Sequence, residues 1–89
     1  MNSIEKSVEI MGKLYAARRG ARSLLGNRYA AKMETYQGHI RQVMENSKCD
    51  SLTATIGLVH KLQEEVEDSG VNQMFLLAAY VEMVEPSKV

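Results

Sequence analysis

Basic side chains cluster between positions 13 and 41, where seven lysines and arginines occur with only one acidic residue. Arginine presents a planar fork of donors that matches carboxylate and phosphate groups. At 100° per residue, Arg18 and Arg22 share one helical face, and Arg28 and Lys32 lie one turn apart. The residues that we expect to bind a partner here are Arg18, Arg19, Arg22, Arg28 and Lys32.

Two ligand classes fit this basic cluster. An acidic protein surface would meet the arginines, whereas nucleic acid would also use the nearby Tyr15, Tyr29 and Tyr36, because aromatic rings interleaved with arginine can stack on bases. No helix-turn-helix, ribonucleoprotein or zinc-finger spacing supports the nucleic-acid interpretation. A third interpretation is that the tyrosines belong to the core and the arginines form a solvated face.

A second charged cluster is acidic and lies near the predicted end of the third helix. It consists of Glu64, Glu65, Glu67 and Asp68. Carboxylates at a helix C-terminus repel one another and oppose the helix dipole, so another group is expected to compensate them. The candidates are the protein's own arginines, a second copy of the chain or a basic partner; the alternative is a tolerated, solvated helix end.

These clusters belong to a wider segregation of charge. Residues 1–48 hold nine basic and four acidic side chains, a net charge of +5, and residues 49–89 hold two and seven, a net charge of −5. The chain is therefore neutral but strongly dipolar, which bears on its partners rather than on its fold.

The sequence offers little that could perform catalysis or hold a cofactor. His39 and His60 are the only histidines, and His60 with Glu64 lacks a further metal ligand. Phosphate-binding loops and nucleophile elbows are missing, and the acidic cluster lacks the spacing of a calcium loop. We therefore predict a non-enzymatic protein without metal or cofactor.

The single cysteine, Cys49, excludes an internal disulfide. This favours a cytoplasmic protein, as does the missing signal-peptide pattern at the N-terminus. The longest apolar run, residues 74–81, is too short to span a membrane, so no membrane partner is expected.

The elements that must position these side chains are helices, and 89 residues form a single domain, 1–89. Helix-stop and capping residues predict an all-α bundle of about four helices over 3–25, 28–46, 52–68 and 71–85. Asn2 is expected to cap the first helix and Gly26 to close it, Asp50 or Ser51 to cap the third, and Pro86 to end the fourth.

Apolar spacing indicates which faces point inward. The stripe of the second helix is Tyr29, Met33, Tyr36, Ile40 and Val43, and that of the third is Leu52, Ile56, Val59, Leu62 (or Gln63) and Val66. The first helix has two stripes: Ile10, Leu14, Ala17, Ala21, Leu24; and Ile4, Val8, Met11, Tyr15. Its small residues Gly12, Ala16 and Gly20 are expected to face away from both stripes.

The fourth helix is apolar nearly all round, since between Met74 and Val84 only Glu82 is charged. It must be either central in the core or covered by a partner, and on this ground we predict a homodimer. The function predicted is that of a regulator, adaptor or inhibitor, a size class common in phage and other mobile elements. It would bind a partner protein through its segregated basic and acidic surfaces. The alternative is a nucleic-acid-binding accessory protein that uses the basic cluster.

Overall fold

The computed structural model describes residues 3–86, with side-chain positions for residues 9–86. Over residues 3–86 the chain forms four α-helices and one short 3₁₀ helix, and this confirms the predicted all-α bundle. The elements are α1 (Ser3–Leu25), η1 (Gly26–Arg28), α2 (Tyr29–Ser47), α3 (Ser51–Glu65) and α4 (Gly70–Val84). The predicted Asn2 cap, and the side chains of Ile4 and Val8, lie outside this description.

The helix ends follow local chemistry. The Asp50 carboxylate accepts a hydrogen bond of 2.8 Å from the Thr53 N–H, so Asp50, one of the two predicted candidates, caps α3. Gly26 has a left-handed φ of +56° after α1, also as predicted, although the chain then continues as η1. The predicted end of the third helix at residue 68 is wrong, because Val66 is extended and Asp68 has a φ of +57°.

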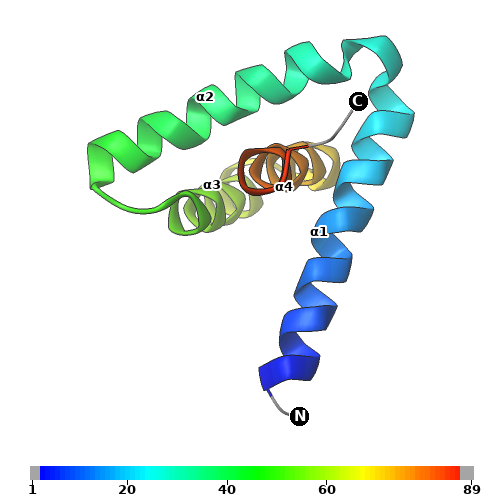
Figure 1. The fold of residues 1–89 in the computed structure, drawn as a ribbon. Helices are drawn as coiled ribbons and strands as arrows, with labels where there is room; N and C mark the ends of the chain where they lie inside the picture. Colours follow the sequence, from blue (N-terminus) through cyan, green and yellow to red (C-terminus); the bar gives the residue numbers. More distant parts are fainter. Residues whose placement is uncertain (1–2, 87–89) are drawn as a thin grey trace.

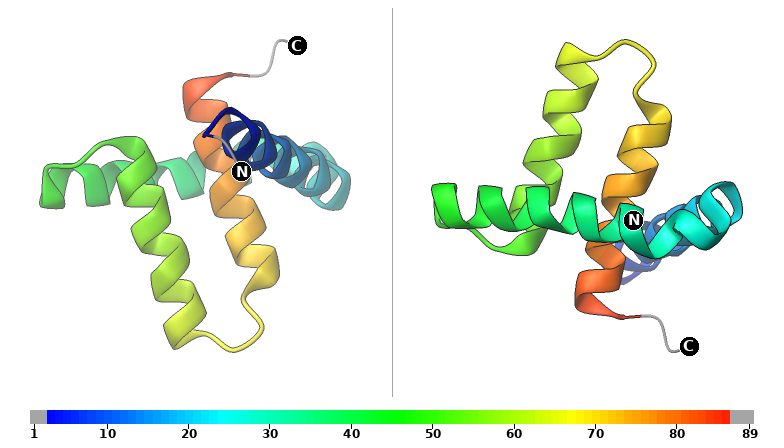
Figure 2. Two further views of the ribbon diagram at one scale, coloured as in Figure 1. Left: turned by 90° about the horizontal axis from the view of Figure 1, so that it is seen from below. Right: turned by 90° about the horizontal axis from the view of Figure 1, so that it is seen from above.

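Two arms and a hairpin make up the molecule. Helices α1 and α2 diverge from the junction at η1, and the hairpin of α3 and α4 crosses them (Figure 1). The loop between α3 and α4 lies at the end of this hairpin farthest from α1 and α2 (Figure 2). The acidic residues of that loop, Glu67 and Asp68, therefore lie away from η1, the connection between α1 and α2 that ends at the basic residue Arg28.

Helix α4 is the centre of the bundle, since its contacts with the other three α-helices are the most extensive. Phe75, Leu76, Ala78, Ala79 and Val81 are buried along it. The other helices of the same chain thus cover most of the apolar surface of α4. That surface therefore does not need a second copy of the chain to cover it. The homodimer remains a prediction.

The predicted inward face of α2 is confirmed. Met33 and Ile40 are buried, and Tyr29, Tyr36 and Val43 pack against the core while partly exposed.

The predicted inward face of α3 is wrong in part. Ala54 and Thr55 are buried, whereas Leu52 and Ile56 are 46% and 48% exposed. Val59 and Leu62 do contact the core. The helix thus turns the side that carries its small residues toward α2 and α4, against which it packs.

Helix α1 uses only part of its predicted apolar surface. Ala17, Ala21 and Leu25 are buried, whereas Ile10 and Leu24 are 48% and 56% exposed. The small-residue face is not directed wholly away from the bundle either, because a Cβ at Gly20 would lie 2.8 Å from the Met74 Sδ. Gly20 therefore allows α4 to approach α1 closely.

Within the described residues, no helix is long and apolar enough to cross a bilayer.

Candidate functional site

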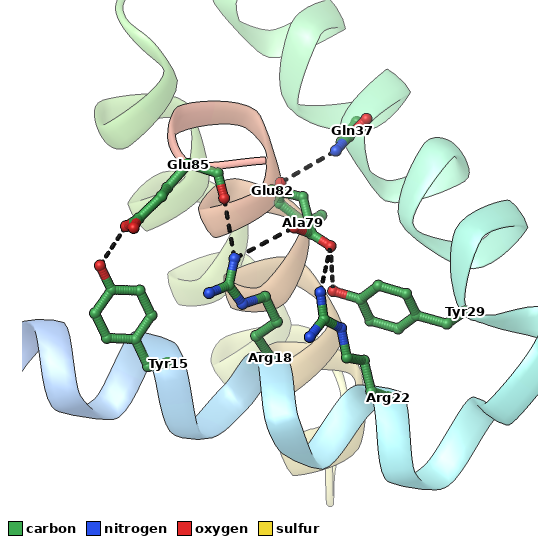
Figure 3. A network of polar contacts seen from close by, with 8 residues as sticks. All are labelled: Tyr15, Arg18, Arg22, Tyr29, Gln37, Ala79, Glu82 and Glu85. Atoms are coloured by element: carbon green, nitrogen blue, oxygen red, sulfur yellow. Dashed lines mark hydrogen bonds and ion pairs between the residues drawn. The ribbon is translucent and has the colours of Figure 1, made fainter. Parts of the chain in front are cut away.

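A polar network built around Glu82 joins α1, α2 and α4 (Figure 3). The Arg18 guanidinium lies 3.3 Å from one Glu82 carboxylate oxygen, and the Arg22 guanidinium lies 3.7 Å from the other. Arg18 also donates a hydrogen bond of 2.9 Å to the carbonyl of Glu85, beyond the last turn of α4. Two of the predicted partner-binding arginines thus meet a carboxylate of their own chain.

Burial makes this network stronger than an ordinary surface pair. The Glu82 side chain is 12% exposed and that of Arg18 is 18% exposed, whereas Arg22 keeps 44% of its side chain in solvent. Ion pairs that are largely removed from water are less screened than exposed ones. Arg18 is therefore mainly structural, while Arg22 also presents a surface to solvent.

Two tyrosines complete the network. The Tyr29 hydroxyl donates a hydrogen bond of 2.8 Å to Glu82, and the Tyr15 hydroxyl donates one to Glu85. The Arg18 guanidinium lies 5.3 Å from the Tyr15 ring centre, and that of Arg22 lies 5.4 Å from the ring centre of Tyr29. Both rings are therefore already engaged by arginines, at cation–π distance.

The network changes the acidity of these phenols. Burial, followed by the hydrogen bond to Glu82, raises the pKa of Tyr29 to about 12. The hydrogen bond to Glu85 is the main cause that raises the pKa of Tyr15. Both tyrosines therefore stay neutral donors at any physiological pH.

The other three residues of the predicted basic site lie on α1, η1 and α2 and are exposed: Arg19, Arg28 and Lys32. None of the three forms an ion pair with any carboxylate described between residues 9 and 86. We call these three residues the basic junction.

The four predicted acidic residues do not all lie on the helix. Glu64 and Glu65 end α3, and Glu67 and Asp68 lie in the loop before α4; together they form the acidic tip. All four are exposed, and among residues 9–86 no basic side chain pairs with them. Compensation by arginines of the same molecule, which the sequence left open, is therefore not found within these residues.

Sequence reasoning missed the residue that organises the network. Glu82 is the only charge in the apolar stretch of α4, and a charge placed in such a stretch needs a partner when the helix is buried. The lone charge could have indicated that Glu82 pairs with an arginine. Residue spacing alone, however, could not show that the segment around Glu82 meets the segment that carries Arg18 and Arg22. Residues 18 and 82 are 64 positions apart.

No cluster of three or more metal-ligating side chains is found in the described part of the chain. Comparison of the chain with protein-family models, with characterised proteins and with solved structures gives no match.

Proposed function

We propose that this protein is a non-enzymatic interaction protein of the adaptor, regulator or inhibitor type. Its basic junction binds an acidic surface of a partner protein, and its acidic tip offers a second, separate surface. The observation that carries the proposal is the difference between two groups of basic residues. Arg18 and Arg22 are held by Glu82, whereas Arg19, Arg28 and Lys32 are exposed and meet no carboxylate of the described side chains.

A protein ligand is supported over nucleic acid by the state of the tyrosines. The rings of Tyr15 and Tyr29 lie against Arg18 and Arg22, and Tyr36 packs against Phe75 and His39. Rings engaged in this way are poor platforms for bases. The overall charge of zero points in the same direction, because non-specific nucleic-acid binders usually carry a basic balance.

Charge reversal at the junction tests this proposal. Arg28→Glu with Lys32→Glu should abolish capture of the partner from lysate treated with nuclease. The matched control is Arg41→Glu with Lys61→Glu, which changes the net charge equally at two exposed positions outside the junction and should bind like wild type. Equal capture by all three proteins would refute the role of the junction.

Arg18 and Arg22 are less suitable for this test. Reversing both would place three carboxylates where the structure holds one between two arginines. Lost binding could then result from unfolding.

The salt dependence of the binding affinity distinguishes nucleic acid, the alternative ligand, from a protein partner. Binding of a labelled DNA or RNA oligonucleotide by the three junction residues should weaken with salt with a log–log slope of about −2 to −3. Affinity of this kind, lost in the junction variant but not in the control, would replace the protein-partner interpretation with the nucleic-acid one.

A further inference from the structure

The bend between α1 and α2 depends on the backbone of one residue. Leu25, Arg28 and Tyr29 all have right-handed helical dihedral angles, and between residues 25 and 29 only Gly26 has a left-handed φ, of +56°. Glycine adopts the left-handed and the right-handed conformation about equally readily. If Gly26 became right-handed and η1 relaxed into an α-helix, α1 and α2 would join into one continuous helix.

The apolar pattern also continues through this connection. Ala21, Leu25, Tyr29, Met33 and Tyr36 follow one another at steps of four, four, four and three residues. This spacing places residues on one side of a helix. A straightened helix would therefore keep the packing residues of both arms on one side, where each arm can still pack against a bundle.

Helix α1 is attached to the rest of the chain mainly through α4. In the described part of the chain, its contacts with α4 are the most extensive between any two elements, whereas those with α2 are slight. Arg18 and Arg22 of α1 pair with Glu82 of α4, and Gly20 lets Met74 of α4 approach closely. The contacts that hold α1 in place are thus concentrated on one partner helix.

Straightening the bend would separate α1 from that partner. Helix α4 lies in the angle between the two arms (Figure 1), so α1 of a straightened chain would point away from its own α4. The packing face of α1 and the matching face of α4 would then both be uncovered. A second chain that is straightened in the same way offers each of these faces its native counterpart.

We propose that two copies of this chain exchange α1, forming a homodimer in which α1 of each copy packs against α4 of the other and residues 3–47 form one helix. Exchange of an identical element is a low-cost route to a dimer, because the contacts between the chains are those that a single chain already makes. The homodimer predicted from the sequence thereby gains an interface. This inference does not depend on the function proposed for the basic junction, and its tests do not measure partner binding.

Gly26→Ala tests the role of the bend. A Cβ at Gly26 would meet nothing within 4 Å, so the substitution acts through the backbone, because alanine disfavours the left-handed conformation. Both connections of the exchanged dimer escape this conformation. At about fivefold for each connection, the Kd of the dimer should fall by about 25-fold.

Gly38→Ala is the matched control, since Gly38 is equally open but lies within α2 without a left-handed φ, and it should leave the Kd unchanged. Wild type and both variants are refolded at concentrations from micromolar to millimolar, and sedimentation equilibrium then measures the Kd. Equal Kd values for the two variants would refute the role of the bend. Three proteins that all keep the mass of one chain, 10.0 kDa, would refute the dimer itself.

A disulfide between α1 and α4 distinguishes exchange from any other dimer. In the Gly26→Ala protein, Gly20→Cys with Met74→Cys places thiols on facing helices and removes the sulfur that would lie 2.8 Å from a Cβ at position 20. Cys49→Ser removes the only other thiol. After oxidation, the monomer fraction should contain disulfides closed within one chain, and the dimer fraction should run as a covalent dimer on a non-reducing gel. A dimer fraction that contains only internally closed chains would overturn the exchange.

Discussion

At the scale of single residues, Glu82 divides the predicted basic site into arginines that are paired within the chain and basic residues that are not. Its carboxylate holds Arg18, Arg22 and Tyr29 together, although these residues come from two different helices. A carboxylate in this position stabilises the fold only while its partners are present, because each of them is partly removed from water. Glu82 thus pairs with two of the five predicted partner-binding basic residues, Arg18 and Arg22, whereas the three residues of the basic junction are exposed.

Glu82→Gln should lower the free energy of unfolding by about 1–3 kcal/mol, because two guanidinium groups lose their charged acceptor. Glu45→Gln removes an exposed carboxylate of α2 that forms no ion pair with the described side chains, and should change stability by less than about 0.5 kcal/mol. Urea denaturation of both variants checks this. Equal effects would mean that the network adds nothing beyond an ordinary surface charge.

At the scale of elements, the ends of the helices are encoded locally. The backbone N–H of Thr53, and then its side chain, lower the pKa of Asp50 by hydrogen bonding to its ionised carboxylate. A carboxyl group whose pKa is lowered by folding stabilises the protein above its unfolded pKa, and that contribution disappears as pH falls through the folded pKa.

Asp50→Asn should therefore keep the cap but lose its pH dependence, since asparagine caps helices about as well as aspartate. Near neutral pH, wild type should be more stable than the Asp50→Asn variant. This difference should disappear as the pH falls below the usual aspartate pKa, because the Asp50 carboxylate then becomes protonated. Asp50→Ala should be less stable than wild type at neutral pH, because the Thr53 N–H loses its acceptor. Thermal melts across this pH range measure the differences, and parallel curves for wild type and the Asp50→Asn variant would contradict the role of the charge.

The close approach of α1 and α4 makes a second prediction at this scale. Gly57→Ala should raise stability by about 0.5–1 kcal/mol, because the site is helical and open. Gly20→Ala should fail to give this gain, since its Cβ would meet the Met74 sulfur at 2.8 Å. Denaturation midpoints of the two variants provide the comparison, and equal gains would show that Met74 moves aside at no cost.

At the scale of the whole molecule, the charge segregation of the sequence becomes a separation in space. The acidic tip lies at the end of the α3–α4 hairpin that is farthest from α1 and α2 (Figure 2). The residues of the basic junction belong to other elements, namely Arg19 to α1, Arg28 to η1 and Lys32 to the first turn of α2. The two surfaces therefore do not neutralise each other within one chain.

The acidic tip should consequently limit stability. Glu65→Gln with Asp68→Asn should stabilise the protein by about 0.3–1 kcal/mol at low salt, because repulsion within the tip and the unfavourable interaction of Glu65 with the α3 dipole are removed. The gain should shrink as salt is added. A loss of stability in thermal melts at low salt would instead show that a basic group compensates the tip.

Local chemistry in the sequence was enough to predict four helices, the Asp50 cap, the left-handed Gly26 and the inward face of α2. These depend on neighbouring residues, or on a stripe so regular that only one face can be buried. The charge segregation also follows from the sequence alone, as does the position of Arg18 and Arg22 beside an apolar stripe.

Only the tertiary structure decided which of two adjacent faces α3 buries, and which partner meets each arginine. Periodicity gives the angle of a side chain around its own helix, but not the helix that will cover it. The small Ala54 and Thr55 are buried in place of Leu52 and Ile56 because α2 and α4 cover that side of α3. Likewise, Arg18 meets Glu82 because α4 runs through the centre of the bundle, a long-range contact that no local spacing encodes.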